Sequence, residues 1–465
     1  MTTTAISTLD PISTSEKKIL RKELYYLLIT LASPIIVQNL IGNSLVMIDT
    51  VMISRLGEAA VAAVGIAGRL QFIFMLLSFG FYSGAGVFIA QYNGSGQRQK
   101  IRSVMALQIA IGVSIAALFT IIGLFFGEFY LRIFSKDPEV IKRGASYLKY
   151  LCLGFIPQAI GYAFVVSLRS IKDPVLPMLV SIVALLVNTF LNYGLIFGKL
   201  GLPMLGVKGA AIATTIARLI ELTLILMPIY FGTRGVLKFH IKDLFSISQE
   251  FTQKYIQVSW PIIMGEAMWG LGSVMYALAY SKLGTTAFAS SQMAQIVNDI
   301  MLVASFGLAS SVGTILGNKL GEGKVKEAIY FSRQIMILSI VIGLATGAIL
   351  MATMPLVPKI FGISGETASN VVKILTVRAA INCLVTFNWT NVTGILRSGG
   401  DTVVALAIDV GPMWMVGVPL AFLGALYFQW PVHIVVMSSF VDELLKFVIG
   451  FPRALKNKWA NELTR

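Results

Sequence analysis

Several carboxylate side chains lie inside long apolar stretches of the sequence, among them Asp49, Glu266 and Asp409. An ionised side chain at the centre of a lipid bilayer costs roughly 2.5–3.5 kcal/mol, so an acid in such a place is a functional candidate. A carboxylate withdrawn from water binds a proton or another cation, and the two compete for the same oxygens. We therefore predict that these three residues take part in cation or proton coupling.

Amide and aromatic side chains accompany these acids at helical spacing. Gln38 lies on nearly the same helical face as Asp49, and Asn188 and Asn192 are neighbours one turn apart. We predict that the three amides support the site, by ligating a cation or by hydrogen bonding to Asp49. Trp269 follows Glu266 by one turn and is predicted to contact a cationic substrate through its ring.

Each candidate also has a structural explanation. Asp49 lies far along its apolar stretch, where it could be solvated or paired with Arg55 at a helix end. Glu266 could be buried against a basic partner, although its own stretch contains no lysine or arginine before Lys282. The asparagine pair could make ordinary hydrogen bonds between helices. Weaker candidates, for which a helix-end or helix-pair role is equally expected, are Gln158, Asn298, Asp299 and Asp409. Two pairs are predicted to be structural: Arg218 with Glu221, and Glu443 with Lys446.

The composition requires a membrane environment. Of 465 residues, 56% are hydrophobic and only 13% are charged, and the mean hydropathy is +0.80. Soluble domains carry about 25% charged residues, so a soluble globule of this composition could not cover its surface. Two cysteines and two histidines are too few for a disulfide scaffold or a dedicated metal cage.

The sequence has no motif of an enzyme or a primary pump. A phosphate-binding G-x-x-x-x-G-K-[ST] run is absent, and so are G-x-S-x-G and H-E-x-x-H. We expect no enzymatic activity and no cofactor. The expected small ligand is the coupling ion, Na⁺ or H⁺, with a possible Na⁺ position near Glu266 or Asp49.

About twelve apolar stretches are long enough to span a bilayer as helices. They are continuously apolar and lack the alternation of a membrane barrel, so an all-α polytopic protein is predicted. The predicted spans are 24–53, 60–91, 103–127, 144–168, 175–197, 209–232, 255–281, 286–317, 329–357, 370–396, 402–427 and 432–450.

The basic residues indicate how these spans are oriented. With the N-terminus in the cytoplasm, the inside segments hold roughly twice as many lysines and arginines as the outside segments. The net charge of +15 is thus a topology signal, and no nucleic-acid partner is expected. We predict a multi-pass protein of the plasma (bacterial inner) membrane with both termini cytoplasmic and no cleaved signal peptide.

The chain contains an internal duplication. Residues 33–102 match 260–329 without a gap, and a second block pairs Leu168-Arg169-Ser170 with Leu396-Arg397-Ser398. Two homologous six-helix lobes are therefore predicted: 1–235, then a cytoplasmic linker 236–254, then 255–465. In the first block Glu266 aligns with Asn39, and Asp49 aligns with Tyr276. Parallel repeats of this kind form transport sites at their interface.

The sequence resembles the multidrug and toxic compound extrusion (MATE) family, in particular its bacterial NorM-like branch. The residues that carry the resemblance are Val46-Met47-Ile48-Asp49-Thr50-Val51-Met52, Trp260-Pro261 with Glu266, both Leu-Arg-Ser blocks with Asp173 and Asp401, and Asn188-x-x-x-Asn192-Tyr193. The resemblance implies two six-helix lobes around a V-shaped cavity, and export of organic cations or drugs driven by entry of Na⁺ or H⁺. It further implies transport by a monomer with alternating access.

Two positions depart from the family pattern. Thr386 stands where the NorM-like branch has an aspartate in the tenth span, and Asp409 in the eleventh span could stand in for that acid. Asn192 stands where another branch has an aspartate in the fifth span. The alternative function is a flippase for a lipid-linked oligosaccharide or another amphiphilic metabolite. Such a protein should present cationic side chains to an anionic headgroup, whereas the favoured candidates here are acidic.

Overall fold

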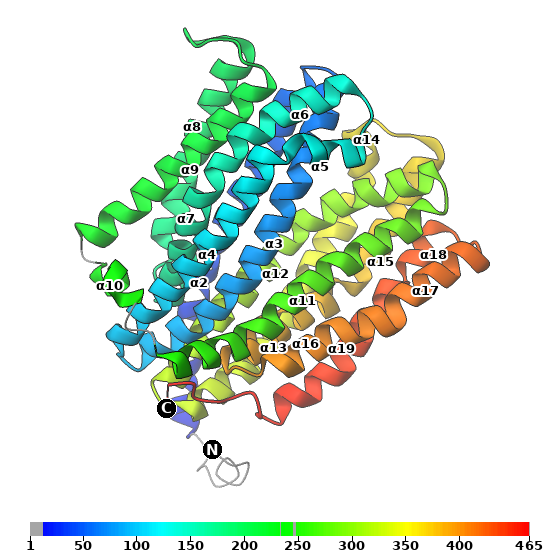
Figure 1. Ribbon diagram of the computed structural model, residues 1–465. Coiled ribbons are helices and arrows are strands. Elements are labelled where there is room, and N and C mark those ends of the chain that lie inside the picture. The colour runs from blue at the N-terminus through cyan, green and yellow to red at the C-terminus, as the bar shows by residue number, and fades with distance from the viewer. Residues whose placement is uncertain (1–12, 233, 245–247, 465) are drawn as a thin grey trace. The chain divides into compact units, whose positions relative to one another are not determined.

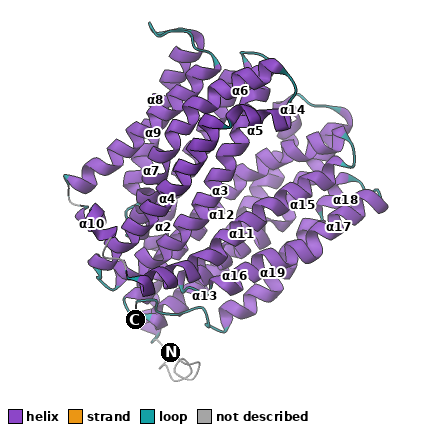
Figure 2. Cartoon of the chain, viewed as in Figure 1, coloured by secondary structure: helices purple, strands orange, loops and turns teal. Residues whose placement is uncertain are grey.

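The computed structural model describes residues 13–232, 234–244 and 248–464. Every regular element in these residues is a helix (Figure 2), and eleven helical segments are long and apolar enough to cross a membrane. The predicted all-α polytopic architecture is confirmed.

The helices are labelled in Figure 1. The eleven segments are α2 (Thr14–Ser54), α3 (Glu58–Gly94), α4 (Arg98–Phe125), α6 with η1 and α7 (Pro138–Ser170), α8 (Val175–Phe197), α9 (Val207–Tyr230), α11 (Gln249–Ser281), α12 (Thr285–Gly321), α13 with η3 and α14 (Val325–Phe361), α15 with η4 (Gly365–Leu396), and α16 with η5, α17 and η6 (Thr402–Tyr427). The remaining elements are α5 (Gly127–Phe134), η2 (Gly235–Leu237), α10 (Ile241–Leu244), α18 (Val432–Val436) and α19 (Ser438–Leu455). The predicted spans 175–197 and 402–427 have the same ends as the observed segments.

The twelfth predicted span, 432–450, falls on α18 and α19. These two helices are separated at Met437, and α19 extends to Leu455. Three charged side chains, Asp442, Glu443 and Lys446, lie within about one turn of α19. With Arg453 they give the 18-residue helix α19 four charged side chains, which is why it is not among the eleven segments apolar enough to cross a membrane.

Several spans are built from more than one helical piece. The segment 138–170 consists of α6 (Pro138–Leu151), the 3₁₀ turn η1 (Cys152–Gly154) and α7 (Phe155–Ser170). The segment 402–427 alternates α16 (Thr402–Pro412) and α17 (Val418–Phe422) with the π-helical turns η5 (Met413–Gly417) and η6 (Leu423–Tyr427). Prolines remove N–H groups from the helical ladder, and π turns absorb such interruptions. A third π turn, η4 (Thr390–Leu396), follows α15 (Gly365–Trp389).

The described chain divides into two compact units. Unit 1 contains the chain up to Ile36, Ala90–Gly96 and the chain from Ile256 onward. Unit 2 contains Val37–Ile89 and Gln97–Tyr255. The two units are defined by which residues pack together, whereas the predicted lobes 1–235 and 255–465 are defined by the sequence repeat. The division into lobes stays a prediction.

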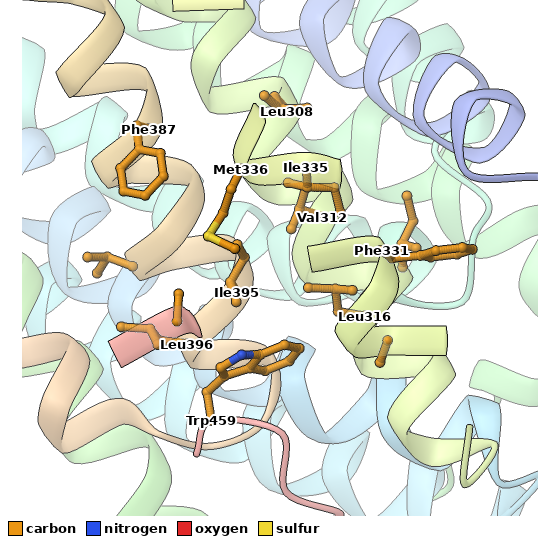
Figure 3. Close-up of a cluster of buried hydrophobic side chains, with 14 of the residues drawn as sticks. Leu308, Val312, Leu316, Phe331, Ile335, Met336, Phe387, Ile395, Leu396 and Trp459 are labelled. Atoms are coloured by element: carbon orange, nitrogen blue, oxygen red, sulfur yellow. The ribbon is translucent and has the colours of Figure 1, made fainter. Parts of the chain in front are cut away.

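Each unit has its own buried apolar core. In unit 1, one cluster joins α12, α13 (Val325–Thr353), α15 and η4 (Figure 3). Figure 3 shows Trp459, from the chain beyond α19, packed beside Leu396 and Leu316 of this cluster. A second cluster of unit 1 lies around α11, α15 and α18, and the core of unit 2 lies around α3, α4, α6 and α9. Helices therefore hold fixed positions within each unit.

Two glycines allow close contacts between helix pairs. A Cβ atom on Gly209 of α9 would lie 2.5 Å from the carbonyl oxygen of Leu195 on α8. A Cβ atom on Gly343 of α13 would lie 2.5 Å from the Cα of Cys383 on α15. Membrane helices pack closely where small residues face each other. In unit 2 this contact fixes α8 against α9, which carry several of the candidate site residues.

Candidate functional site

Asp49 accepts a hydrogen bond from an asparagine of another helix. Asn192 Nδ2 of α8 lies 2.5 Å from Asp49 Oδ1 of α2. The same nitrogen lies 2.8 Å from Asn188 Oδ1, one turn earlier on α8. Asn188 Nδ2 in turn lies 3.4 Å from Thr214 Oγ1 of α9. Both asparagines are fully buried and Asp49 is half-buried, so three helices of unit 2 place one carboxylate, two amides and one hydroxyl together.

The arrangement around Asp49 is rich in oxygen ligands. Hard cations prefer carboxylate and carbonyl oxygens. The amide oxygen of Asn192 is buried and has no hydrogen-bond partner. In the part of the chain that the structure describes, no three His, Cys, Asp or Glu side chains are grouped to hold a metal ion. The Asp49 group thus combines one carboxylate with neutral amide and hydroxyl oxygens.

Gln38 does not reach the Asp49 group. Its side-chain oxygen accepts a hydrogen bond from Arg169 Nη2 of α7 at 2.5 Å, and its Nε2 donates to Ser181 Oγ of α8 at 2.9 Å. Gln38 and Arg169 are both buried. Gln38 and Asp49 are 11 residues apart on α2, about 17 Å along the helix. Although they share a helical face, they therefore contact different partners.

Glu266 forms an ion pair with a basic residue from another helix. Arg397 Nη1, directly after η4, lies 2.8 Å from Glu266 Oε1 of α11. The side chains are 4% and 14% exposed respectively, so the pair is largely withdrawn from water but the carboxylate keeps some access. Removing one partner of such a buried pair carries a substantial free-energy cost.

Trp269 lies in an aromatic group of unit 1. Its ring centroid is 6.5 Å from that of Trp389, which is 6.0 Å from the ring of Phe306, both in edge-to-face arrangements. Such edge-to-face contacts stabilise packed rings. The group joins α11, α12 and α15 one turn from Glu266, so the position of Trp269 near that acid agrees with the sequence.

Asp409 belongs to a charged cluster that the sequence did not reveal. Asp409 Oδ1 of α16 lies 3.5 Å from Lys446 Nζ of α19. Lys446 Nζ is also 3.1 Å from Asp442 Oδ1 and 3.1 Å from Glu443 Oε1. The predicted pair of Glu443 and Lys446 is thus present, but it is part of a larger group. Asp409 partners a lysine there.

Thr386, which replaces the tenth-span acid, is fully buried. Its hydroxyl lies 2.8 Å from Ser305 Oγ of α12 and donates to the carbonyl of Asn382. Among the weaker candidates, Asp299 accepts a hydrogen bond from Gln295, which in turn accepts one from Arg378. These hydrogen bonds link α12 to α15.

Two loop aspartates form matching ion pairs. Asp401 accepts two hydrogen bonds from Arg453, at 2.8 and 3.0 Å. Asp173 pairs with Arg234 through a single contact with the arginine Nε. Each aspartate follows a Leu-Arg-Ser block of the repeat, so each repeat has an aspartate–arginine pair at this point, although the two arginines are not at equivalent repeat positions.

The sequence model of the MatE family matches this chain twice, over residues 34–194 and again over 261–423. Together the two matches cover well over half of the sequence and coincide with the internal duplication. The chain belongs to the MatE family.

Several curated relatives span nearly the whole chain. A "Probable multidrug resistance protein NorM" of Thermotoga maritima is 25% identical over 95% of this chain and 93% of its own length. The "Uncharacterized transporter YisQ" of Bacillus subtilis is 26% identical over 88% of this chain and 90% of its own. The "Multidrug resistance protein MdtK" of Pectobacterium atrosepticum is 25% identical over 85% and 86%.

Solved structures share the fold. A transporter of the MOP superfamily from Pyrococcus furiosus aligns with a TM-score of 0.84 at 19% identity, over 96% of this chain and 100% of its own. A multidrug resistance MATE family transporter in an outward-facing conformation aligns with a TM-score of 0.84 at 19% identity, over 96% and 98%. The family match and the relatives named as multidrug resistance proteins, with eleven membrane-length helical segments in the described residues, make this MatE protein a multi-pass membrane transporter and not an enzyme.

The structure of this MatE protein adds three basic residues to the candidate set: Arg169, Arg397 and Lys446. Each is buried and each contacts a predicted site residue. A signal for the two arginines was present, because both lie in the repeated Leu-Arg-Ser block. For Lys446 the sequence contained one indication, the presence of Glu443 three positions earlier, and this spacing predicted an ion pair within one helix.

Proposed function

We propose that the protein exports organic cations, including drugs, in exchange for Na⁺ or H⁺. The observation that carries this proposal is the half-buried Asp49 carboxylate, held by the Asn188–Asn192 pair among oxygen ligands from three helices. Relatives over most of the chain are named multidrug resistance proteins. A carboxylate at this depth attracts cations, which matches that cargo class.

Coupling would follow from competition at one carboxylate. A proton, Na⁺ and a cationic cargo all bind carboxylate oxygens, so each ligand weakens binding of the others. If each ligand favours a different open state, this competition becomes the coupling free energy of an antiporter. A membrane potential of 100 mV adds about 2.3 kcal/mol for each charge that crosses. In this proposal the two lobes alternate access to the site, and the protein acts as a monomer.

Glu266 would serve as the second exchange position. Its partner Arg397 already supplies the positive charge that the carboxylate requires. A cationic cargo would compete with Arg397 for Glu266, and Trp269, one turn away, would contact the cargo through its ring. The orientation with both termini in the cytoplasm, in the bacterial inner membrane, follows the distribution of basic residues.

A flippase for an anionic lipid-linked cargo is the second candidate function. Two buried arginines of unit 2 favour it, because Arg169 Nε and Arg218 Nη1 have no hydrogen-bond partner. An anionic headgroup would satisfy such donors. Against it, the best-held basic groups at depth, Arg397 and Lys446, are already bound by carboxylates.

Transport into vesicles separates the two functions. Reconstituted protein should drive accumulation of ethidium when a Na⁺ or pH gradient is imposed, and Asp49→Asn should abolish it. Glu128→Gln is the matched control, since Glu128 forms only an exposed ion pair with Arg132. If the Asp49→Asn variant accumulates ethidium like the wild type, Asp49 is not the exchange site. Scrambling of a labelled anionic lipid without any gradient would instead favour the flippase.

A further inference from the structure

Lys446 is surrounded by carboxylates from two helices. Its ammonium group contacts Asp442 and Glu443 of α19 at 3.1 Å each and Asp409 of α16 at 3.5 Å. The lysine side chain is only 3% exposed. An ammonium group has three N–H donors. Of the three carboxylates, Glu443 accepts a hydrogen bond from this group, whereas the buried Asp442 Oδ1 has no hydrogen-bond partner. The cluster therefore has more acceptor oxygens than the one ammonium group satisfies.

The cluster carries more negative than positive charge. Three carboxylates surround one ammonium, so two further cations or protons are needed to neutralise this buried cluster. Two neutral groups complete the surroundings. Tyr276 of α11 donates its hydroxyl to Asp442 at 3.1 Å, and Asn388 of α15 donates to Glu443 at 2.7 Å.

A buried amide oxygen also points to a missing ligand. Asn388 is 3% exposed, and its Oδ1 has no hydrogen-bond partner although its Nδ2 is bound to Glu443. Buried acceptors without donors are rare in folded proteins. An ammonium group near Glu443 would supply a donor to this oxygen as well as to the carboxylates.

We propose that Asp442 and Glu443 bind a primary ammonium group of the cargo, and that Lys446 occupies this position when cargo is absent. This inference rests on the proposed export of organic cations and adds that primary amines are one class of them, bound at this cluster. Lys446 acts as a tethered competitor. When cargo binds, its ammonium shifts towards Asp409, the most distant and, at 16% side-chain exposure, the most accessible of the three carboxylates.

The chemistry distinguishes primary from quaternary ammonium ions. A primary ammonium donates hydrogen bonds to Asp442, Glu443 and Asn388, whereas tetramethylammonium has the same charge and no N–H donor. A charged cluster that acted only through its net charge would bind both. Selection for the N–H donors is therefore the signature of this site.

Binding to the purified full-length protein tests the proposal without any gradient. The probes are propylammonium chloride and tetramethylammonium chloride, measured as the shift of the unfolding temperature at constant ionic strength. Lys446→Met keeps the apolar stem and removes the competitor. Since a tethered group acts at an effective concentration in the millimolar range, its removal should raise the affinity for propylammonium about tenfold. The affinity for tetramethylammonium should not change.

Further variants locate the effect. Adding Asp442→Asn to Lys446→Met should cancel the gain, whereas adding Asp49→Asn should leave it in place. If Lys446→Met does not fold, Asp442→Asn alone supplies the test, because it should weaken propylammonium binding and leave ethidium binding at the Asp49 group unchanged. The proposal is overturned if affinity is unchanged or falls in Lys446→Met, if both probes gain equally, or if Asp442→Asn has no effect. Failure of gradient-driven transport would count only against the export function.

Discussion

Glu266 is bound by Arg397, whose guanidinium lies 2.8 Å from the carboxylate and 131 positions later in the chain. Gln38 is bound by Arg169 across the same separation of 131 positions. The two pairs are copies of one contact in the two repeats. In this contact Gln38 takes the place of Glu266, although the ungapped match of the two repeats aligns Glu266 with the next residue, Asn39. The ungapped match used a shift one residue smaller than the shift between the two arginines.

The Glu266 pair predicts different results for two substitutions. Glu266→Gln keeps an acceptor for Arg397, as Gln38 does for Arg169, so the unfolding temperature should fall only slightly. Glu266→Ala leaves Arg397 buried without a partner and should cost about 3–5 kcal/mol of stability. Thermal unfolding in detergent measures both changes.

Glu266→Gln also separates folding from transport. Because the variant retains the contact but loses the charge, gradient-driven ethidium transport should stop while the protein stays folded. Gln38→Glu is the reciprocal variant and should leave transport in place. A Glu266→Gln protein that transports every cation tested at the wild-type rate would show that Glu266 has only a structural role.

The Asp49 group predicts a Na⁺ effect that depends on one hydroxyl. Thr214→Val removes the hydroxyl beside Asn188 with little change of shape, whereas Thr214→Ser keeps it. If Na⁺ is the coupling ion, NaCl should stabilise the wild type and Thr214→Ser relative to choline chloride, and Thr214→Val should need about tenfold more Na⁺. Equal Na⁺ dependence in the two variants would exclude Thr214 from the cation site.

Competition with protons gives this Na⁺ effect a pH dependence. Protonation of Asp49 removes the charge that binds Na⁺, so the Na⁺ concentration at half-maximal stabilisation should increase as pH falls from 8 to about 6. The Asp49→Asn variant should show neither the Na⁺ effect nor its pH dependence. A Na⁺ effect that is constant with pH in the wild type would place the cation away from any titrating carboxylate.

Much of the fold could be predicted from the sequence because membrane helices require long apolar runs. The segments 175–197 and 402–427 have the predicted ends. One contact between two spans could also be predicted: the hydrogen bond from Asn192 to Asp49 is present. Apolar runs and helical spacing give the face of a residue but not the rotation of its helix against others.

The basic partners show where this limit lies. Glu266 and Arg397 come from different segments of the chain, and so do Asp409 and Lys446. Whether two such side chains meet depends on how their helices are shifted and rotated against each other, which is decided by packing. No local pattern around Glu266 indicates an arginine 131 positions away. The repeat did contain the information for one of these contacts, because Gln38 with Arg169 and Glu266 with Arg397 keep one separation. The Lys446 cluster has no such copy and required the packed helices.

The close approach of α13 to α15 predicts a stability difference between two glycine substitutions. Gly343→Ala would place a Cβ atom 2.5 Å from the backbone of Cys383, a position that requires the helices to move apart. Such overpacking typically costs about 1–3 kcal/mol. Gly161→Ala is the matched control, because Gly161 lies inside α7 and a Cβ atom added there would have no neighbour within 4 Å. Alanine there should be neutral or stabilise by up to about 1 kcal/mol, because alanine is the better helix former. Thermal unfolding of both variants in the same detergent measures the difference, and equal unfolding temperatures would contradict the observed α13–α15 contact.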